Sequence, residues 1–120
     1  MAKGYTGKIL RINLTDQTTR VETLSELVLR CYLGGGLLGA YFLYRETPPG
    51  LDPFAPEAPL MFMTSATCGT SFSGANRYSA IAKSPLTGGF GEADAVFAGD
   101  ACLQDDHLVS VSLQLVLNAL

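Results

Sequence analysis

The chain has 120 residues, of which 48% are hydrophobic and 16% are charged. This length fits one small domain or a piece of a larger protein, and the composition supports a buried core rather than disorder. No apolar run is long enough to span a membrane, and no signal-peptide pattern follows the first residues, so we expect a cytoplasmic protein without membrane contact.

The net charge of −3 is unevenly distributed. Through Lys83 there are eight basic and six acidic residues, and after Lys83 there are five acidic residues and no basic ones. The basic residues do not cluster with aromatic ones, which argues against nucleic-acid binding. The three cysteines are odd in number and far apart, so they indicate neither a disulfide framework nor a CxxC metal site.

The N-terminal part predicts a β-hairpin. Residues 7–14 alternate between apolar and polar side chains, turn formers follow at 15–17, and residues 18–23 are rich in β-branched side chains. The predicted buried face holds Leu10, Ile12 and Leu14, with Lys8, Arg11 and Asn13 mostly toward water.

Two helices are predicted next. Ser25 can accept a backbone hydrogen bond as an N-cap, with Leu24 and Leu29 as a hydrophobic staple, and Gly34 can end this helix. The predicted buried face consists of Leu24, Leu27, Val28, Cys31 and Tyr32, which makes Cys31 a core residue. A second, apolar helix is predicted over 37–46 and stops before Pro48.

The rest of the chain predicts further strands and two unusual loops. Five of the six prolines lie between residues 47 and 59, which favours an extended surface connection before strands at 60–64 and 78–83. The expected fold class is therefore α+β: an N-terminal β-hairpin, two helices and further strands of a mixed sheet.

Loops 65–77 and 84–94 are made of small, hydroxyl and glycine residues, and each follows a predicted strand. Backbone N–H groups in such loops can converge on an anion, with Arg77 binding it in bidentate fashion and Lys83 as a nearby point charge. We therefore expect both loops to face one anionic ligand. The alternative is that the glycines only form tight turns and Arg77 lies in solvent.

Other candidate catalytic residues are few. His107 is the single histidine and has no partner acid or nucleophile, so a surface position is expected. Glu92 and Asp94 form a close carboxylate pair that could serve as acid and base or as metal ligands, or could simply be solvated.

Four blocks of sequence resemble the aldehyde ferredoxin oxidoreductase family in order and spacing. They are residues 7–15, 33–40, 49–53 and 77–88, and the resemblance runs from Tyr5 to about Asp94. Lys-Ser-Pro-Leu-Thr-Gly at 83–88 is the most specific of these motifs.

The resemblance implies that residues 1–95 are part of an N-terminal domain that binds one face of a bis-pterin cofactor holding tungsten or molybdenum. It implies that Arg77 lies between pterin and a 4Fe-4S cluster, and that the 93–95 segment is a loop touching pterin and a bridging magnesium. The cofactor-binding residues expected on these grounds are Gly74, Asn76, Arg77, Lys83, Ala93, Asp94 and Ala95. Cluster cysteines, metal ligands and catalytic residues are not expected in this chain.

The chain also departs from the family pattern. Gly36 stands where the family usually has arginine, and residues 96–120 form a divergent tail of unknown role, which a frameshift or fragment gene would explain. The tail's uncharged, alternating residues 108–117 are an aggregation hazard if exposed.

The expected function is the N-terminal part of an enzyme that oxidises aldehydes and passes electrons to ferredoxin, inactive without a missing C-terminal portion or subunit. The alternatives are a free-standing anion- or pterin-binding module and a non-functional gene fragment.

Overall fold

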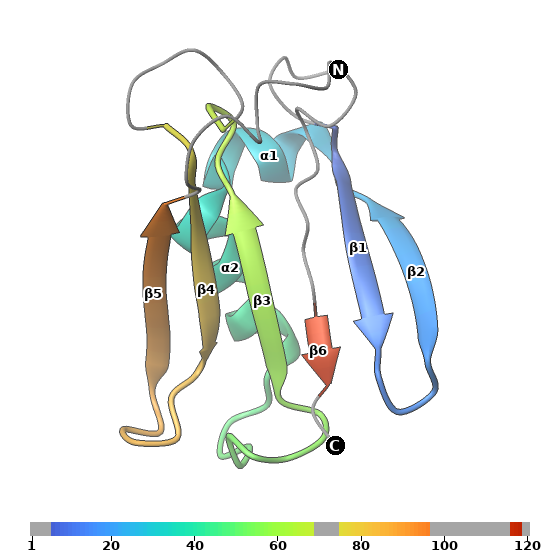
Figure 1. The fold of residues 1–120 in the computed structure, drawn as a ribbon, viewed down its shortest axis with the longest axis vertical. Helices are drawn as coiled ribbons and strands as arrows, with labels where there is room; N and C mark the ends of the chain where they lie inside the picture. Colours follow the sequence, from blue (N-terminus) through green and yellow to red (C-terminus); the bar gives the residue numbers. More distant parts are fainter. Residues whose placement is uncertain (1–5, 69–74, 97–115, 119–120) are drawn as a thin grey trace.

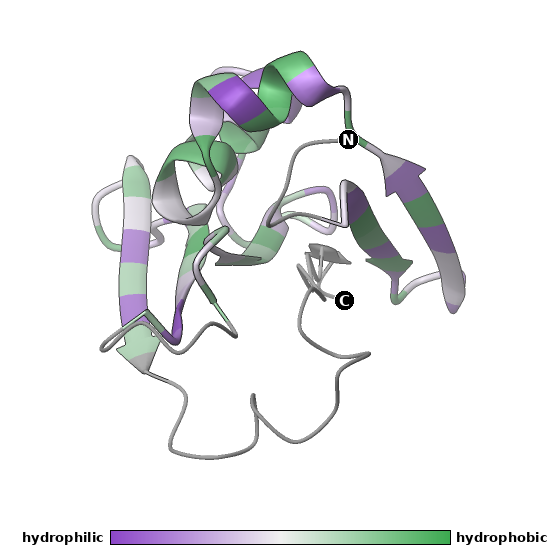
Figure 2. Cartoon of the chain, turned by 90° about the horizontal axis from the view of Figure 1, so that it is seen from above, coloured by the Kyte–Doolittle hydropathy of each residue, from purple (hydrophilic) through white to green (hydrophobic). Residues whose placement is uncertain are grey.

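The computed structural model describes residues 6–68, 75–96 and 116–118 of the chain. The elements are β1 (Lys8–Asn13), β2 (Thr18–Thr23), α1 (Glu26–Tyr32), α2 (Gly35–Glu46), β3 (Pro59–Thr64), β4 (Arg77–Lys83), β5 (Phe90–Val96) and β6 (Val116–Asn118). The strands form one mixed sheet in the order β2-β1-β6-β3-β4-β5. Both helices lie on one face of it (Figures 1 and 2). The predicted α+β class is confirmed.

The hairpin of β1 and β2 is confirmed, but its buried face is not the predicted one. Ile9 is 1% exposed, whereas Leu14 is 44% exposed. Arg11 lies on the same face as Ile9 and reaches α2 rather than water. The alternation of apolar and polar residues in β1 therefore predicts the wrong buried face. The helix layer covers the face that carries Ile9 and Arg11, and the carboxylate of Glu46 neutralises the charge of Arg11 there.

Arg11 joins the hairpin to the helix layer. Its guanidinium donates to both carboxylate oxygens of Glu46 at 2.8 and 2.5 Å, and its Nε donates to Glu22 at 2.6 Å. It also lies 5.5 Å from the centre of the Phe42 ring. The hydrogen bonds to Glu46 raise the pKa of Arg11 above its ordinary value, against the opposing effect of partial burial.

Helix α1 begins as predicted and ends differently. The hydroxyl of Ser25 accepts from the backbone N–H of Val28 at 3.4 Å, which confirms the N-cap. Leu33, with φ of 58°, takes the left-handed position at the C-cap, ahead of the predicted Gly34. Cys31 is exposed, so its prediction as a core residue is wrong. The buried face is centred on Leu29, and this leaves the Cys31 side of the helix in solvent.

Helix α2 lies against the sheet with little space between them. It starts at Gly35, two residues before the predicted start. A Cβ built on Gly39 would lie 2.2 Å from Cδ1 of Ile81, so the absence of a side chain at position 39 permits this close approach. The core cluster beneath the helix consists of Ile9, Leu38, Phe42, Leu43, Met61, Met63 and Ile81.

The second predicted loop is shorter than expected. Residues 90–96 form β5, which pairs with β4 in antiparallel fashion from Lys83↔Phe90 to Arg77↔Val96. The prediction of a loop over 84–94 is therefore wrong for residues 90–94. These small and acidic residues have low strand propensity, so the sequence did not indicate a strand. Their pairing with β4 makes them one.

Part of the C-terminal tail joins the same sheet. Strand β6 runs parallel to β1, with Arg11 opposite Val116, and antiparallel to β3, with Leu60 opposite Leu117. The division of the chain at residue 95 stays a prediction, and His107 lies outside the described residues. Among the described residues there is no helix with the length and apolar character needed to cross a membrane.

Candidate functional site

The start of β4 and the end of β5 bring together five of the predicted cofactor-binding residues. Tyr78 is opposite Ala95, and Ala80 is opposite Ala93, so the two segments are adjacent despite their separation in sequence. The residues gathered at this end of the sheet are Asn76, Arg77, Ala93, Asp94 and Ala95. Gly74 lies outside the described residues.

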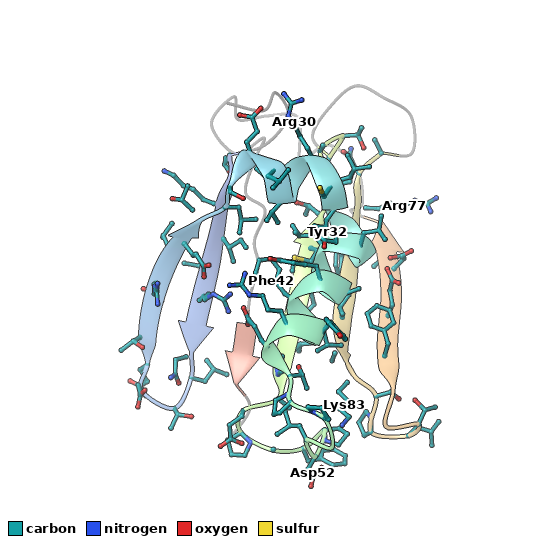
Figure 3. All side chains as sticks on the ribbon, turned by 180° about the vertical axis from the view of Figure 1, so that it is seen from behind. Arg30, Tyr32, Phe42, Asp52, Arg77 and Lys83 are labelled. Atoms are coloured by element: carbon teal, nitrogen blue, oxygen red, sulfur yellow. The ribbon has the colours of Figure 1, made fainter. Side chains whose placement is uncertain are left out.

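Arg77 is the first residue of β4 and is exposed. Its side chain points outward from the molecule (Figure 3). No carboxylate among the described residues forms an ion pair with it. A guanidinium placed in this way is available to bind an anion presented from outside the described part of the chain.

Ser79 contacts the candidate site residue Asp94 and was not predicted from the sequence. It is 8% exposed, and its hydroxyl donates to Oδ1 of Asp94 at 2.5 Å. The alternation of β4 places Ser79 on the same face as the buried Ile81, where a polar residue is unexpected, and this was the signal available in the sequence. The bond fixes the Asp94 carboxylate next to β4.

The glycine turn before α2 lies at the same end of the sheet. Gly34 forms an isolated β-bridge with Ser65, and a Cβ on Gly34 would lie 2.7 Å from the Thr64 carbonyl oxygen. A Cβ on Gly36 would lie 2.0 Å from Oε1 of Glu92. The space that a side chain at position 36 would need is therefore taken by a carboxylate from β5.

Glu92 and Asp94 both project from β5 toward the helix side of the sheet, because they lie opposite Ile81 and Ser79. They are two residues apart on one strand, as the sequence indicated. In the described part of the chain, no third His, Cys, Asp or Glu joins them in a group that could hold a metal ion.

Lys83 lies at the opposite end of β4 from Arg77. The seven residues of this strand separate the two side chains by roughly 20 Å. The ammonium group of Lys83 donates to the backbone carbonyl of Leu51 in the proline-rich connection. It therefore fixes one loop to another and is not a neighbour of Arg77.

The expectation that both glycine-rich loops face one ligand is wrong. Residues 65–68 follow β3 and residues 75–76 precede β4, whereas residues 84–89 join the end of β4 to β5. The β3-β4-β5 meander is antiparallel, so these two groups of described residues lie at opposite ends of the sheet (Figure 1). Loops that follow successive strands share an edge only when the strands are parallel.

The family-specific motif at 83–88 has a structural role in the hairpin between β4 and β5. The amide of Ser84 donates to the Gly89 carbonyl at 2.8 Å, and its hydroxyl accepts from the amide of Thr87 at 3.3 Å. Gly88 has φ of 68°, a conformation that favours glycine. The motif thus specifies a turn, in which Gly88 provides the positive φ.

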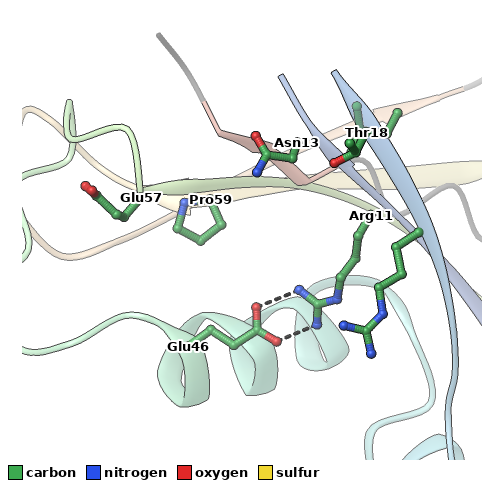
Figure 4. A pocket seen from close by; sticks show the side chains of 8 residues that line it. Arg11, Asn13, Thr18, Glu46, Glu57 and Pro59 are labelled. Carbon is green, nitrogen blue, oxygen red and sulfur yellow. Dashed lines mark hydrogen bonds and ion pairs between the residues drawn. The ribbon is translucent and has the colours of Figure 1, made fainter. Parts of the chain in front are cut away.

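A pocket lies away from the predicted cofactor residues, between the β1–β2 hairpin and the C-terminal end of α2 (Figure 4). Its volume is about 400 Å³. The Arg11–Glu46 ion pair forms part of its wall (Figure 4). The lining residues are Arg11, Ile12, Asn13, Thr18, Arg20, Glu46, Glu57 and Pro59.

Comparison with known proteins identifies the family. The profile of the family described as "Aldehyde ferredoxin oxidoreductase, N-terminal domain" matches residues 9–101. The chain belongs to the aldehyde ferredoxin oxidoreductase family. The match continues past Asp94, where the resemblance read from the sequence ended, so the family pattern extends further along this member than expected.

Two relatives are named tungsten-containing aldehyde ferredoxin oxidoreductases. The protein from Pyrococcus abyssi is 46% identical over 104 residues, covering 80% of this chain and 17% of the relative. The protein from Pyrococcus horikoshii is 43% identical over 120 residues, covering 90% of this chain and 20% of the relative. The chain thus spans about one fifth or less of the length of these family members.

A solved structure shares the fold of this family member. It is titled "Active site complex BamBC of Benzoyl Coenzyme A reductase in complex with 1,5 Dienoyl-CoA". The match has a TM-score of 0.75 at 31% identity and covers 78% of this chain and 14% of the other. The described fold is therefore shared with part of a protein whose title names benzoyl coenzyme A reductase, whereas the two relatives are named for aldehyde ferredoxin oxidoreductase.

Proposed function

We propose that this chain is the N-terminal part of an aldehyde ferredoxin oxidoreductase, and that it contributes contacts to a bis-pterin cofactor that holds tungsten or molybdenum. The observation that carries the proposal is the pairing of β4 with β5, which places Arg77 beside the 93–95 segment at one end of the sheet. The sequence resemblance pointed to these same two segments, and the relatives' names support tungsten.

The residues present suit a large anionic group. Arg77 is exposed and has no carboxylate partner among the described residues, so its planar guanidinium can bind a phosphate or the edge of a pterin ring. Asn76 precedes it in the chain, and the backbone of Ala93, Asp94 and Ala95 lies at the strand end beside it. The cofactor, when bound, would supply the redox chemistry, and this chain would supply binding and orientation.

The remaining parts of the site would come from elsewhere. The family's 4Fe-4S cluster ligands, the magnesium site, the aldehyde pocket and the ferredoxin contact belong, in this proposal, to a missing C-terminal portion or a second subunit. This chain covers only 17% and 20% of the lengths of the two Pyrococcus relatives, which supports that division. The chain alone would be inactive and cytoplasmic.

Complementation tests the proposal. The full chain would be co-expressed with the part of the Pyrococcus abyssi relative that it does not cover. Tungsten and molybdenum content and aldehyde-dependent dye reduction would then be measured on the purified complex. We expect metal and activity in the complex and neither in the chain alone.

Substitutions at Arg77 separate binding from folding. Arg77→Ala should lower metal content and activity at least tenfold, and Arg77→Lys should restore part of the loss, because an ammonium keeps the charge without the bidentate geometry. Arg20→Ala removes another exposed arginine, on β2, and serves as the control. Full metal loading in the Arg77→Ala complex would contradict the assignment. Tight pyrophosphate binding by the chain without metal would favour a free-standing binding module.

A further inference from the structure

The two helices leave one face of the sheet open, and this open face, which carries Leu10, Phe62 and Ala80, holds almost no charge. Figure 1 views it with the helices behind the sheet. Side chains alternate between the two faces of a strand, and residues paired across strands share a face. In β1 to β5, every charged residue except Lys8 therefore projects to the helix side, together with the buried Ile81. A sheet face of this kind marks a surface for association.

The strand registers arrange the open face in rows that cross the sheet. Strand β6 aligns β1 with β3, because Ile12 and Leu60 are both opposite Leu117. The central row runs from β2 to β5 and consists of Val21, Leu10, Phe62, Ala80 and Ala93. The next row consists of Thr19, Ile12, Leu60, Ala82 and Gly91. In both rows the side chains are bulky on β1 and β3 and small on β4 and β5.

We propose that two copies of this chain associate through the open face, related by a two-fold axis that runs parallel to the strands between the two sheets. Such an axis reverses the strand order, so β1 of one copy lies over β4 of the other, and β2 lies over β5. The bulky part of each row then meets the small part: Leu10 packs on Ala80, and Val21 packs on Ala93. The inference goes beyond the proposed function.

Charge favours a second copy as the occupant. A two-fold contact brings a surface against itself, and like charges that face each other would oppose it. In the described strands, Lys8 alone brings a charge to the open face, and its row continues through Thr64 to Tyr78. The reversed strand order places Lys8 over the Tyr78 ring of the other copy, where a cation–π contact is favourable.

The area of the open face is sufficient for a reversible dimer. Six strands spaced by about 4.8 Å, each about 20 Å long, give roughly 500 Å² per copy. Two copies would bury about 1,000 Å², which is at the lower limit for a specific interface. The dimer should therefore form and dissociate with the concentration of the chain.

Sedimentation equilibrium of the full chain tests the proposal. We expect a reversible monomer–dimer equilibrium in the wild type. Ala80→Asp should weaken the dimer at least tenfold, because it places an unpaired carboxylate in the middle of the contact. Leu86→Asp adds the same charge in the β4–β5 hairpin, at an apolar residue that is 94% exposed, and should leave the equilibrium unchanged. A wild type that sediments only as a monomer would overturn the proposal.

A charge-swap pair tests the arrangement without depending on the folding of Ala80→Asp. Val21 and Ala93 are exposed residues on the two edge strands, separated within one copy by about 24 Å. Val21→Glu and Ala93→Lys should each weaken the dimer, because each buries an unpaired charge. The chain with both substitutions should recover most of the association, because each carboxylate then meets an ammonium of the other copy. Additive losses in the double variant would refute the two-fold arrangement.

The remaining part of the enzyme is the competing occupant of the open face. The wild-type chain and Ala80→Asp would each be co-expressed with the part of the Pyrococcus abyssi relative that this chain does not cover. A one-to-one complex that forms with the wild type and is lost in Ala80→Asp would assign the open face to that part and overturn self-association. A complex that tolerates Ala80→Asp would leave the open face to the second copy, as proposed.

Discussion

Replacing Arg11 with methionine should weaken the attachment of the N-terminal hairpin to the helix layer, where Ile9 also packs. The substitution keeps an apolar stem over the Phe42 ring and removes the bonds to Glu46 and Glu22. It also leaves these two carboxylates near each other without a cation. The perturbation therefore tests whether one guanidinium holds two layers of the fold together.

The magnitude follows from burial and geometry. The Arg11 cluster, which consists of Arg11, Glu22 and Glu46, is partly buried. The exposed fractions of these side chains are 22%, 33% and 31%, so the cluster lies between a surface ion pair and a fully buried one. Surface ion pairs contribute about 0–1 kcal/mol, and hydrogen bonds to charged groups about 1.5–3 kcal/mol. A bidentate pair with a third bond at this exposure should stabilise the fold by roughly 2 kcal/mol.

Thermal and urea unfolding, followed by circular dichroism, measure the loss. At about 2.1 cal/mol/K per residue, the unfolding entropy of this chain is roughly 0.25 kcal/mol/K, so 2 kcal/mol corresponds to a midpoint lowered by about 8 °C. Arg11→Lys should show about half of that loss, because it keeps charge but not the bidentate geometry.

The matched control is Arg30→Met. Arg30 pairs with Glu26 across one turn of α1, but its side chain is 73% exposed, and no measurable change is expected. Two results would refute the reasoning that the Arg11 cluster joins the two layers. One is an unfolding midpoint for Arg11→Met equal to that of the wild type. The other is a decrease in the midpoint for Arg30→Met as large as that for Arg11→Met.

Three further predictions test packing and the site. Gly39→Ala should destabilise the chain by about 1–3 kcal/mol in urea unfolding despite better helix propensity, and Ile81→Val should relieve part of the loss by removing the methyl that lies 2.2 Å from the new Cβ. Phe42→Ala should cost about 3–5 kcal/mol by the same measurement because its ring is 1% exposed; a loss below 1 kcal/mol would contradict the described core. Ser79→Ala should cost about 1 kcal/mol through the bond to Asp94, and Asp94→Asn should show little additional effect in that background.

Local chemistry in the sequence was enough to predict most elements. The alternation at 7–14, the turn formers after it and the Ser25 cap act within a few residues, so the hairpin and α1 appear almost where they were expected. The prolines between 47 and 59 separated α2 from β3 for the same local reason. Family membership also followed from motifs that are read along the chain, and the comparisons confirm it.

What the sequence left undecided depends on contacts between distant residues. Arg11 binds Glu46 of α2, which lies 35 positions away in the sequence. The helix layer therefore covers the face of β1 that carries Arg11. Residues 90–96 form a strand only because β4 provides a partner. The antiparallel direction of that pairing also separates Lys83 from Arg77 and brings Glu92 to Gly36. Strand direction and layer placement are set by packing across the whole chain, and no local pattern records them.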